Sequence, residues 1–385
     1  MTVLGVFFTR GVSLQQWVES GLFDREVLIY HVHLDSGFFT KIYWFTYGDD
    51  DQILAKRLYE SGRLSMKIEV VGCPPWFRFT GRASSALYSL LLPAIASNQV
   101  SHCDVFKTNQ MDGSLTALIC GWIWRRQVYV RTGFTLSRVI SKTSPGNWLR
   151  HTVAYINELL AFWCAGATSI SSRFDMEYVI QRYGKKISTR LAIVGNYVDT
   201  QLFAPSVMNE GMDNRVLYVG RLSPEKNLDN AIAACAAVGI GIDIVGAGRE
   251  LSRLKKIEAE SGAHVRWLGV LPNKQLPNLF QNYRYFILPS LWEGLPKSLI
   301  EAMAAGLVCI GNNTTGINEI IEDGVTGYLS PTADAVNLAK TLLRALEGDN
   351  ERISRLGRQF ICSEFSLEAI SLKEQAIFTK LIADK

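Results

Sequence analysis

The chain has 385 residues, more than one hydrophobic core usually organises, so we expect two domains of somewhat under 200 residues each. Apolar residues make up 48% and charged residues 20% of the sequence, which excludes an intrinsically disordered chain. Basic residues outnumber acidic ones by 21 to 14 over residues 1–195, whereas acidic residues outnumber basic ones by 22 to 19 over residues 196–385. The net charge of +4 therefore hides a basic first half.

In the first half, short β-rich runs alternate with longer helical patterns, which is typical of β-α-β units around a parallel sheet. We predict strands over residues 3–8, 27–32, 42–46, 66–71, 105–108, 128–131 and 168–171. We predict helices over residues 14–20, 51–60, 113–124 and about 148–165. The most apolar internal stretch, residues 83–96, falls short of the roughly 20 residues that cross a bilayer, so no spanning helix is expected.

The second half repeats this alternation. Its predicted strands cover residues 215–219, 241–245, 265–268, 285–288 and 308–310. The whole pattern predicts an α/β protein with two facing Rossmann-like doubly wound domains, of residues 1–192 and 193–365, joined near residues 192–212. The last helix, at about residues 366–385, can pack back on the first domain. Two such sheets in sequence place a ligand cleft at the carboxyl ends of their strands.

The segment 285–310 is the most informative one. A predicted strand ends at Pro289, and a predicted helix begins with Pro296 in its first turn. Glu293 and Glu301 would be roughly 12 Å apart along such a helix, too far for the two carboxyls of a glycosidase. This spacing suits a ligand gripped at both ends, such as a nucleotide-sugar. The alternative is a helix-terminal charge at Glu293 and an exposed Glu301.

A second informative segment, which carries two basic residues, lies at the start of the second half. Gly220 ends a buried strand, and Arg221 and Lys226 follow in the loop before the next helix. At the carboxyl end of a strand these two cations are placed to bind a diphosphate and to offset the charge of a leaving group.

Several motifs in order make residues 193–332 resemble the retaining glycosyltransferases of GT-B type often called family 4. The matching residues are Gly220-Arg221-Leu222 with Lys226, Gly246-Ala-Gly248, Gly269-Val270-Leu271-Pro-Asn273, Glu293-Gly294 with Glu301 and Gly306, and Gly316 with Glu319, Gly324 and Gly327. The resemblance implies a hexosyltransferase-type enzyme with two Rossmann-like domains.

The resemblance also implies roles for individual residues. Arg221 and Lys226 would bind the donor diphosphate and act in catalysis with Glu293. The other implied donor contacts are Glu301 to the ribose, Glu293 with the amides of Gly294 and Leu295 to the transferred sugar, and the backbone of Gly269, Val270 and Leu271 to the base. The implied substrate is a UDP- or GDP-linked sugar, with no cofactor and no essential metal.

The first half departs from the family pattern. The loop after the first strand has a single glycine, Gly11, where the family often has a glycine-rich loop. The family commonly has a first-domain histidine near the transferred sugar, whereas this chain offers Arg131 in the segment 130–134. Gly11 and Arg131 are therefore the acceptor-side candidates.

Other candidate sites are weaker. His31 and His33 would share one face of a predicted strand, without a nearby carboxylate or cysteine, so packed histidines are favoured over a metal site. Asp49-Asp50-Asp51 has the D-x-D spacing of another glycosyltransferase fold, but follows a strand and is interpreted as a polar turn.

The expected reaction is transfer of a sugar, with retention, to a hydroxyl acceptor. The basic first half holds seven of the nine tryptophans, which suits a lipid-linked or lipopolysaccharide or exopolysaccharide glycan and a membrane surface. The equally favoured alternative is that these rings fill the core and the charges are solvated. The seven scattered cysteines indicate a reducing compartment, so we expect a cytoplasmic enzyme, peripheral on the inner face of the membrane. No nucleic acid partner is expected, because the basic residues form no stripe. The alternatives are a GT-B phosphorylase or epimerase, or a non-catalytic partner subunit that binds nucleotide-sugars.

Overall fold

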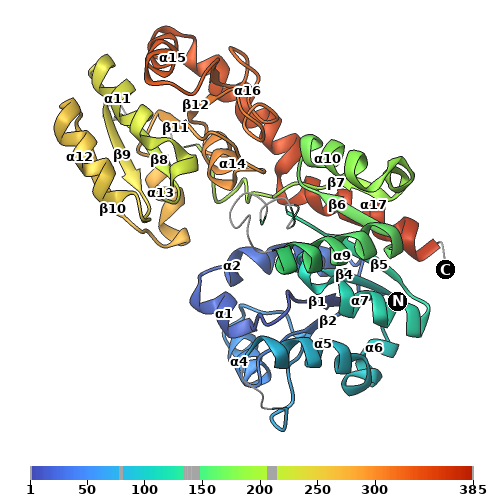
Figure 1. Ribbon diagram of the computed structural model, residues 1–385. Coiled ribbons are helices and arrows are strands. Elements are labelled where there is room, and N and C mark those ends of the chain that lie inside the picture. Colours follow the sequence, from blue (N-terminus) through green and yellow to red (C-terminus); the bar gives the residue numbers. More distant parts are fainter. Residues whose placement is uncertain are drawn as a thin grey trace. The chain divides into compact units, whose positions relative to one another are not determined.

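The computed structural model divides the chain into two compact units (Figure 1). It describes residues 2–383 except 78–80, 134, 136, 138, 139, 141–147 and 206–214. Unit 1 consists of Met1–Val194 with Ser371–Lys385, and unit 2 of Gly195–Ile370. Part of the predicted junction, residues 206–212, and Phe134 of the segment 130–134 lie outside the described residues.

Unit 1 is built on a seven-stranded parallel sheet with the order β3-β2-β1-β4-β5-β6-β7. The strands are β1 (Val3–Phe7), β2 (Lys41–Phe45), β3 (Ile68–Val71), β4 (Val105–Thr108), β5 (Gln127–Arg131), β6 (Ala167–Ile170) and β7 (Leu191–Ile193). The helices are α1 (Leu14–Glu19), α2 (Phe23–Glu26), α3 (Leu28–Asp35), α4 (Asp51–Glu60), α5 (Arg82–Ile95), α6 (Ser97–Ser101), α7 (Ser114–Trp124), α9 (Trp148–Cys164) and α10 (Arg173–Tyr183). Six of the seven predicted strands are confirmed, with boundary shifts of a residue or two.

The predicted strand over residues 27–32 is wrong, because residues 28–32 belong to α3 and Val27 caps it. The run of valine and isoleucine there favoured a strand, since β-branched residues are enriched in strands. The buried residues of the helix instead follow a helical spacing: Ile29, Tyr30, His33 and Leu34. Packing of this apolar face therefore outweighed the local strand propensity.

The same helix corrects the interpretation of the two histidines. Residues two apart on a helix point in different directions, so His31 and His33 do not share a face. His33 is fully buried, and its Nε2 lies 3.0 Å from Oε2 of Glu374 in helix α17 (Leu367–Ala383). A carboxylate distant in sequence is thus the neighbour that the sequence did not reveal. Among the described residues no cluster of three potential metal ligands is present.

Glu374 also fastens the end of the chain to unit 1. The Lys107 ammonium group, on β4, lies 2.7 and 2.6 Å from the two carboxylate oxygens of Glu374. Both side chains are at least 98% buried. The charge of Lys107 and the hydrogen bond from His33 outweigh the effect of burial and hold the pKa of Glu374 below its usual range.

Unit 2 is built on a six-stranded parallel sheet with the order β10-β9-β8-β11-β12-β13. The strands are β8 (Arg215–Val219), β9 (Gly241–Val245), β10 (Val265–Gly269), β11 (Tyr285–Leu288), β12 (Val308–Asn312) and β13 (Tyr328–Ser330). The helices are α11 (Leu228–Val238), α12 (Leu251–Ser261), α13 (Leu276–Phe280), α14 (Lys297–Ala304), α15 (Ala335–Glu347) and α16 (Asn350–Phe365). All five predicted strands are confirmed, and β13 was not predicted.

The strand order defines where a ligand can bind in unit 2. The chain runs from β8 outward to β9 and β10, and then returns so that β11 pairs with the other side of β8. The order therefore reverses between β8 and β11. In open α/β sheets ligands bind outside the carboxyl ends of the strands at such a reversal. The loops that follow β8 and β11 are the segments that the sequence singled out.

Two further properties bear on function. Among the described residues, no helix combines the length and apolarity needed to cross a membrane. All seven cysteines are free.

Candidate functional site

A charged pair lies across the reversal point of unit 2. The Nζ atom of Lys226, in the loop after β8, is 2.6 Å from Oε1 of Glu293, in the loop after β11. Ser290 donates a hydrogen bond of 2.6 Å to the same carboxylate oxygen. The side chains of Lys226 and Glu293 are 13% and 11% exposed, so both remain open to a small ligand while being largely shielded from bulk solvent.

Two asparagines hold these loops in place. Asn227 has a left-handed backbone conformation with a φ of 56°, and its side-chain amide donates to the carbonyl groups of Pro289 and Ala333 at 3.1 and 2.9 Å. The Asn312 amide also donates to the Pro289 carbonyl. The main chain of Leu291 donates to the carbonyl of Glu225 at 2.8 Å. These bonds tie the Lys226 loop directly to the Glu293 loop.

A turn that contains Gly316 packs against the backbone of Glu293. The Glu293 amide donates to the Thr315 carbonyl at 3.0 Å. Gly316, with a φ of +83°, packs so closely that a Cβ atom there would lie 2.7 Å from the Glu293 carbonyl oxygen and nearer still to that of Gly294. Only glycine suits both the conformation and the space. Among the described residues, no hydrogen bond from the amides of Gly294 and Leu295 to another protein group is present.

Arg221 is the most exposed of the charged site residues that were predicted. Its side chain is 81% exposed, and its guanidinium group lies 3.8 Å from the Glu225 carboxylate. Burial alone would raise the pKa of Glu225, but hydrogen bonds from Ser223 and its own backbone, with the charges of Lys226 and Arg221, lower the pKa below its usual value. The negative charge of Glu225 therefore holds Arg221 near the loop without burying it.

Glu301 and Glu293 do not lie on one helix. Pro296 caps helix α14, and the helix covers Lys297–Ala304, so Glu293 precedes it. The separation of about 12 Å, which assumed a continuous helix, therefore does not apply. Glu301 is partly buried in the second turn of α14. Gly306, with a φ of +81°, follows the helix as the predicted C-terminal stop.

Gly269 and Val270 lie at the carboxyl end of β10, two strands away from β8. The Gly246 amide donates to the Gly269 carbonyl at 2.7 Å, which joins the two glycine-containing turns. Val270 is 71% exposed, and Leu271 packs partly against the core.

Sequence reasoning missed Ser290 and Asn227. Asn227 follows Lys226, and Ser290 follows the predicted end of a strand, and both carry hydrogen-bonding side chains.

The acceptor-side candidates lie in unit 1. Gly11 follows β1 with a φ of +75°, and a Cβ atom there would be 3.2 Å from the Ser85 hydroxyl. Arg131 ends β5, is 13% exposed, and lies 3.9 Å from Glu26. Asp51 accepts hydrogen bonds from the amides of Leu14 and Gly48, so it is a structural turn residue, as the sequence indicated.

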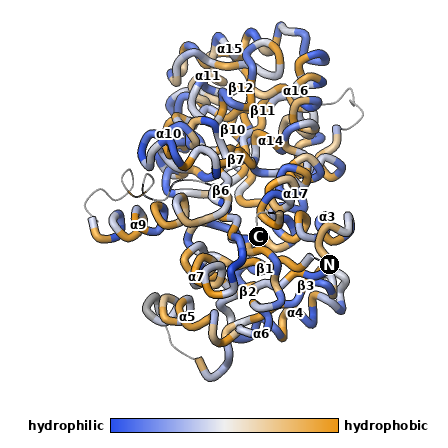
Figure 2. Tube along the Cα trace, turned by 90° about the vertical axis from the view of Figure 1, so that its right-hand side faces the viewer, coloured by the Kyte–Doolittle hydropathy of each residue, from blue (hydrophilic) through white to orange (hydrophobic). Residues whose placement is uncertain are grey.

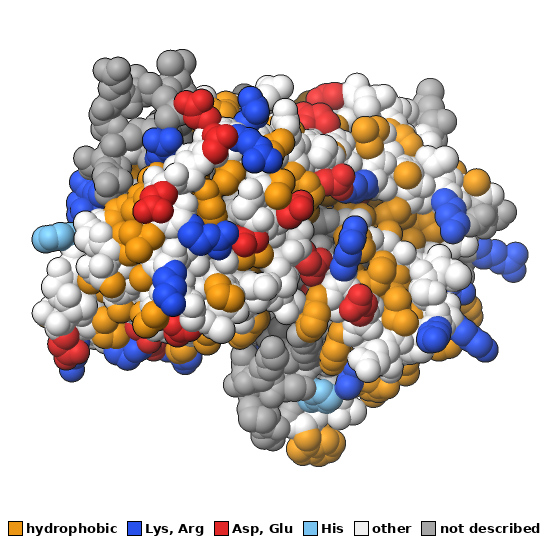
Figure 3. Space-filling model, turned by 90° about the horizontal axis from the view of Figure 1, so that it is seen from above, with side chains coloured by type: hydrophobic (Ala, Val, Ile, Leu, Met, Phe, Trp, Pro, Cys, Tyr) orange, Lys and Arg blue, Asp and Glu red, His pale blue; other side chains and the backbone are white. Residues whose placement is uncertain are grey.

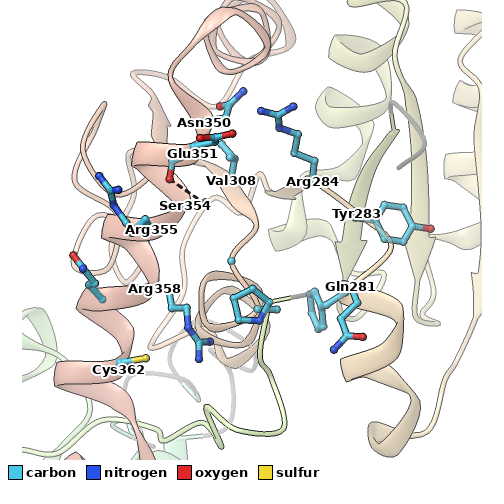
Figure 4. A pocket seen from close by; sticks show the side chains of 15 residues that line it. Gln281, Tyr283, Arg284, Val308, Asn350, Glu351, Ser354, Arg355, Arg358 and Cys362 are labelled. Atoms are coloured by element: carbon cyan, nitrogen blue, oxygen red, sulfur yellow. Dashed lines mark hydrogen bonds between the residues drawn. The ribbon is translucent and has the colours of Figure 1, made fainter. Parts of the chain in front are cut away.

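A pocket of about 440 Å³ lies at the opposite edge of the unit 2 sheet (Figure 4). It adjoins the amino ends of β11 and β12, near Tyr283 and Val308, and is lined by Arg284, Arg355 and Arg358. None of the predicted donor residues lines it. This pocket is therefore separate from the ligand site expected at the carboxyl edge of a parallel sheet.

Comparison with known proteins identifies the class of the second unit. Residues 200–359 match the family model described as Glycosyl transferases group 1, so the chain contains a domain of this family. This range holds Arg221, Lys226, Glu293 and Glu301. The whole chain has a GT-B-type fold: HepE of Anabaena, in a crystal structure with UDP, aligns over 99% of this chain and 100% of its own with a TM-score of 0.73 and 18% identity.

A second solved structure agrees on the fold. The lipopolysaccharide outer core galactosyltransferase WaaB, in its apo form, aligns over 99% of this chain and 100% of its own with a TM-score of 0.69 and 17% identity.

Two curated relatives are similar over shorter regions. The amylovoran biosynthesis glycosyltransferase AmsK of Erwinia amylovora is 35% identical over 148 residues, which cover 35% of this chain and 36% of AmsK. The UDP-Gal:α-D-GlcNAc-diphosphoundecaprenol α-1,3-galactosyltransferase of Escherichia coli is 29% identical over 176 residues, covering 41% of this chain and 46% of that enzyme. The matched regions thus span less than half of each relative.

Proposed function

We propose that the protein is a retaining glycosyltransferase that moves a sugar from a nucleotide diphosphate sugar to a hydroxyl acceptor. The observation that carries this proposal is the Lys226–Glu293 pair across the strand-order reversal of unit 2, inside the matched family region. The site combines a shielded cation, a shielded carboxylate and backbone amides. This is the set of groups that a ligand with a diphosphate and a hydroxyl-rich sugar requires.

Different residues bind the diphosphate and the transferred sugar. Lys226 and Arg221 face the diphosphate and offset the negative charge that grows as the glycosidic bond breaks. Glu293, with the amides of Gly294 and Leu295, holds the transferred sugar. Attack from the same face, with the leaving phosphate as base, gives retention and needs no protein nucleophile.

Binding of the nucleoside end uses the remaining predicted residues. Glu301 accepts hydrogen bonds from the ribose hydroxyls. The backbone of Gly269, Val270 and Leu271 flanks the base. Recognition by backbone groups does not distinguish the base by side-chain identity, so we propose either a UDP-sugar or a GDP-sugar as donor. The UDP in the HepE structure favours the UDP-sugar.

The acceptor is proposed to be a lipid-linked or lipopolysaccharide or exopolysaccharide glycan, bound on unit 1 near Gly11 and Arg131. The names of the relatives support this class, since one acts in amylovoran biosynthesis and one on a diphosphoundecaprenol-linked sugar. A cytoplasmic enzyme, peripheral on the inner membrane face, fits this acceptor. That no nucleic acid binds stays a prediction; on the face drawn in Figure 3, Lys and Arg side chains are interspersed with acidic and apolar ones.

Product analysis tests this proposal. The protein is incubated with UDP- and GDP-sugars and a diphosphoundecaprenol-linked acceptor, and the product linkage is determined by NMR. The proposal predicts nucleotide release that depends on the acceptor, and a product with the donor's anomeric configuration. Inversion would contradict the retaining mechanism, phosphate-dependent turnover would indicate a phosphorylase, and nucleotide binding without turnover would indicate a partner subunit.

A further inference from the structure

The pocket at the amino edge of the unit 2 sheet contains polar groups that the fold itself does not use (Figure 4). Its volume of about 440 Å³ lies within the range of small-molecule sites. All of its lining residues belong to unit 2. Since none of the predicted donor residues lines it, a ligand of this pocket has to be inferred from the pocket's own chemistry.

One face of helix α16 forms a wall of this pocket. The lining residues of the helix recur every three or four positions, as residues on one helical face do; they are Asn350, Glu351, Ser354, Arg355, Arg358, Gln359 and Cys362. Ile353, Gly357 and Ile361 are buried on another side of the helix. Figure 2 shows hydrophilic and hydrophobic residues in turn along α16. The helix therefore turns mainly polar side chains toward the pocket.

The other walls supply apolar surface. They come from the end of α13, the residues after α14 and the starts of β11 and β12, and they include Phe280, Ala305 and Val308. Apolar walls with a few polar groups are typical of ligand sites. An occupant that has a carbon skeleton as well as a charge fits such walls.

Two arginines of the lining have no carboxylate partner. Arg284, immediately before β11, is directed toward the amino end of α16, where Asn350 lies (Figure 4). Arg355 is an exposed residue of α16. In the part of the chain that the structure describes, neither guanidinium group forms an ion pair. Both are therefore available to an anion, and the guanidinium fork matches phosphate oxygens well.

A third arginine, Arg358, is already used by the fold. Its guanidinium group donates to the carbonyl groups of Thr200, Phe203 and Ala304. Its positive charge nevertheless adds to the charges of the other two arginines, and Glu351 is the one acidic residue among the described lining residues. Three positive charges and one negative charge favour a dianion over a singly charged ligand.

Asn350, at the start of α16, has an unused acceptor. The residue is 5% exposed, and its Nδ2 atom donates to the Tyr285 hydroxyl at 3.1 Å. Its Oδ1 atom is buried and accepts no hydrogen bond from any residue that the structure describes. A buried acceptor without a donor is costly, so such atoms are normally satisfied by a ligand or a water molecule. A hydroxyl group of an occupant would satisfy this one.

We propose that this pocket binds a small hydroxylated phosphomonoester, at a site separate from the donor site. The phosphate group pairs with Arg284, and Arg355 adds a second guanidinium group at the rim. The carbon skeleton lies against Phe280 and Val308, and a hydroxyl group donates to Asn350. A phosphate dianion accepts from two guanidinium groups at once, whereas a carboxylate offers fewer oxygen atoms and half the charge. This inference does not depend on the transferase activity proposed above.

Isothermal titration calorimetry tests the inference on the full chain. The probes are glucose 1-phosphate, glucose 6-phosphate and glycerol 3-phosphate, and glucose and inorganic phosphate serve as comparisons. At least one phosphomonoester is expected to bind as one equivalent with a Kd of about 1 mM or below. It should bind at least about tenfold more tightly than glucose or inorganic phosphate, because each of these lacks one part of the ligand.

A charge variant locates the phosphate contact. Arg284→Gln/Arg355→Gln removes both available guanidinium groups and should weaken binding at least about tenfold. The matched control Arg352→Gln/Lys340→Gln removes the same charge from exposed positions of α16 and α15 outside the pocket. The control should bind like the wild type.

A steric variant tests the location without a change of charge. Ser354→Trp places a large ring in the pocket from the middle of the α16 face and should also weaken binding at least about tenfold. Ser363→Trp, at an exposed position of the same helix outside the pocket, should bind like the wild type. Lys226→Ala, which alters the proposed donor site, should retain phosphomonoester binding. Circular dichroism establishes that all variants fold.

Three outcomes would overturn the inference. One is failure of all three phosphomonoesters to bind the wild type. Another is binding of glucose or inorganic phosphate as tightly as any phosphomonoester. The third is binding that persists in the folded pocket variants and is lost in Lys226→Ala, which would place the ligand at the donor site. A loss of sugar transfer with intact phosphomonoester binding would affect only the proposed function.

Discussion

Both units place a cation and a carboxylate across the reversal of their strand order, but in different environments. In unit 2 the pair is Lys226 and Glu293, which are 13% and 11% exposed. In unit 1 the order reverses between β1 and β4, and Arg10, after β1, lies 2.9 Å from Asp112, after β4. Arg10 and Asp112 are 36% and 32% exposed. The same topology thus gives a shielded site in one unit and a more open one in the other.

The two units also differ in where their shielded pairs of charged side chains lie. Unit 2 keeps shielded charge at the sheet edge, where a ligand can reach it. Unit 1 instead buries Lys107 and Glu374 in its interior, where the pair fastens the C-terminal segment to β4. We therefore expect charge changes at the buried Lys107–Glu374 pair of unit 1 to alter mainly stability, and charge changes at the carboxyl edge of the unit 2 sheet to alter mainly catalysis.

The largest expected effect is on the stability of unit 1. Lys107→Met leaves the buried Glu374 carboxylate with only the His33 hydrogen bond and the more distant charge of Arg131. Removal of one partner of a buried ion pair lowers the free energy of unfolding by about 3–5 kcal/mol. Urea unfolding measures this loss. The double variant Lys107→Met/Glu374→Gln should recover part of it, because no unpaired carboxylate remains. A loss below about 1 kcal/mol would mean that the pair does not fasten the segment.

The next effect is on catalysis at unit 2. Lys226→Ala removes the cation that faces the diphosphate and should lower kcat/KM by about 10²–10³-fold, the usual effect of removing one group that stabilises transition-state charge. Lys255→Ala, at an exposed position of α12, is the matched control and should retain activity. Equal activities of the two variants would remove Lys226 from the catalytic machinery.

A smaller effect is expected for the turn at Gly316, which is compared with the turn at Gly324. Gly316→Ala forces a Cβ atom against the Glu293 and Gly294 carbonyls at a positive φ, so it should destabilise unit 2 by about 1–3 kcal/mol and weaken donor binding. Gly324→Ala has a similar φ, +73°, with nothing within 4 Å, and should show the conformational effect alone. Calorimetry compares the two. If Gly324→Ala weakens donor binding as much as Gly316→Ala does, close packing against Glu293 is not what matters.

The smallest effect concerns the open pair of unit 1. Burial raises the pKa of Asp112, although the Arg10 charge and hydrogen bond oppose this shift. A carboxyl whose pKa is raised in the folded state favours folding when protonated. The wild type should therefore lose stability relative to Asp112→Asn as the pH rises from below about 3.9, the value of an unfolded aspartate, through the raised pKa.

The expected difference at pH 7 is below about 1 kcal/mol, since the pair is partly exposed. Unfolding curves of both proteins from pH 3 to pH 7 measure it. A difference that grows in favour of the wild type as the pH rises would contradict the sign.

The strands, and the loops at the carboxyl edge of the unit 2 sheet, could be predicted because the sequence patterns that indicate them are local. Short buried runs bounded by polar turns define β8, β9 and β11. Gly220 directly follows β8, and Lys226 and Glu293 lie in the segments after β8 and β11. Helix α3 could not be predicted in this way, because the packing of Ile29 and Leu34 decided between two local preferences.

Contacts between distant residues were beyond prediction from one sequence. Nothing near His33 or Lys107 indicates Glu374, which is more than 260 residues away from either. The support of Glu293 by Thr315 and Gly316 likewise depends on a loop that folds back from beyond β12. The helical rise used for the separation of Glu293 and Glu301 does not apply over its whole length, because α14 begins after Pro296.

The central claim is that Lys226, Glu293 and Glu301 form a donor site, and thermal unfolding with a panel of UDP- and GDP-sugars tests it most directly. A ligand at 100 times its Kd stabilises a protein by about 2.7 kcal/mol, which raises Tm by several degrees. We predict that one donor does this for the wild type and for the exposed control Glu322→Ala, whereas Glu301→Ala and Lys226→Ala lose the shift. If no nucleotide-sugar raises the Tm of the wild type, or if both variants keep the full shift, the donor site is not where we place it.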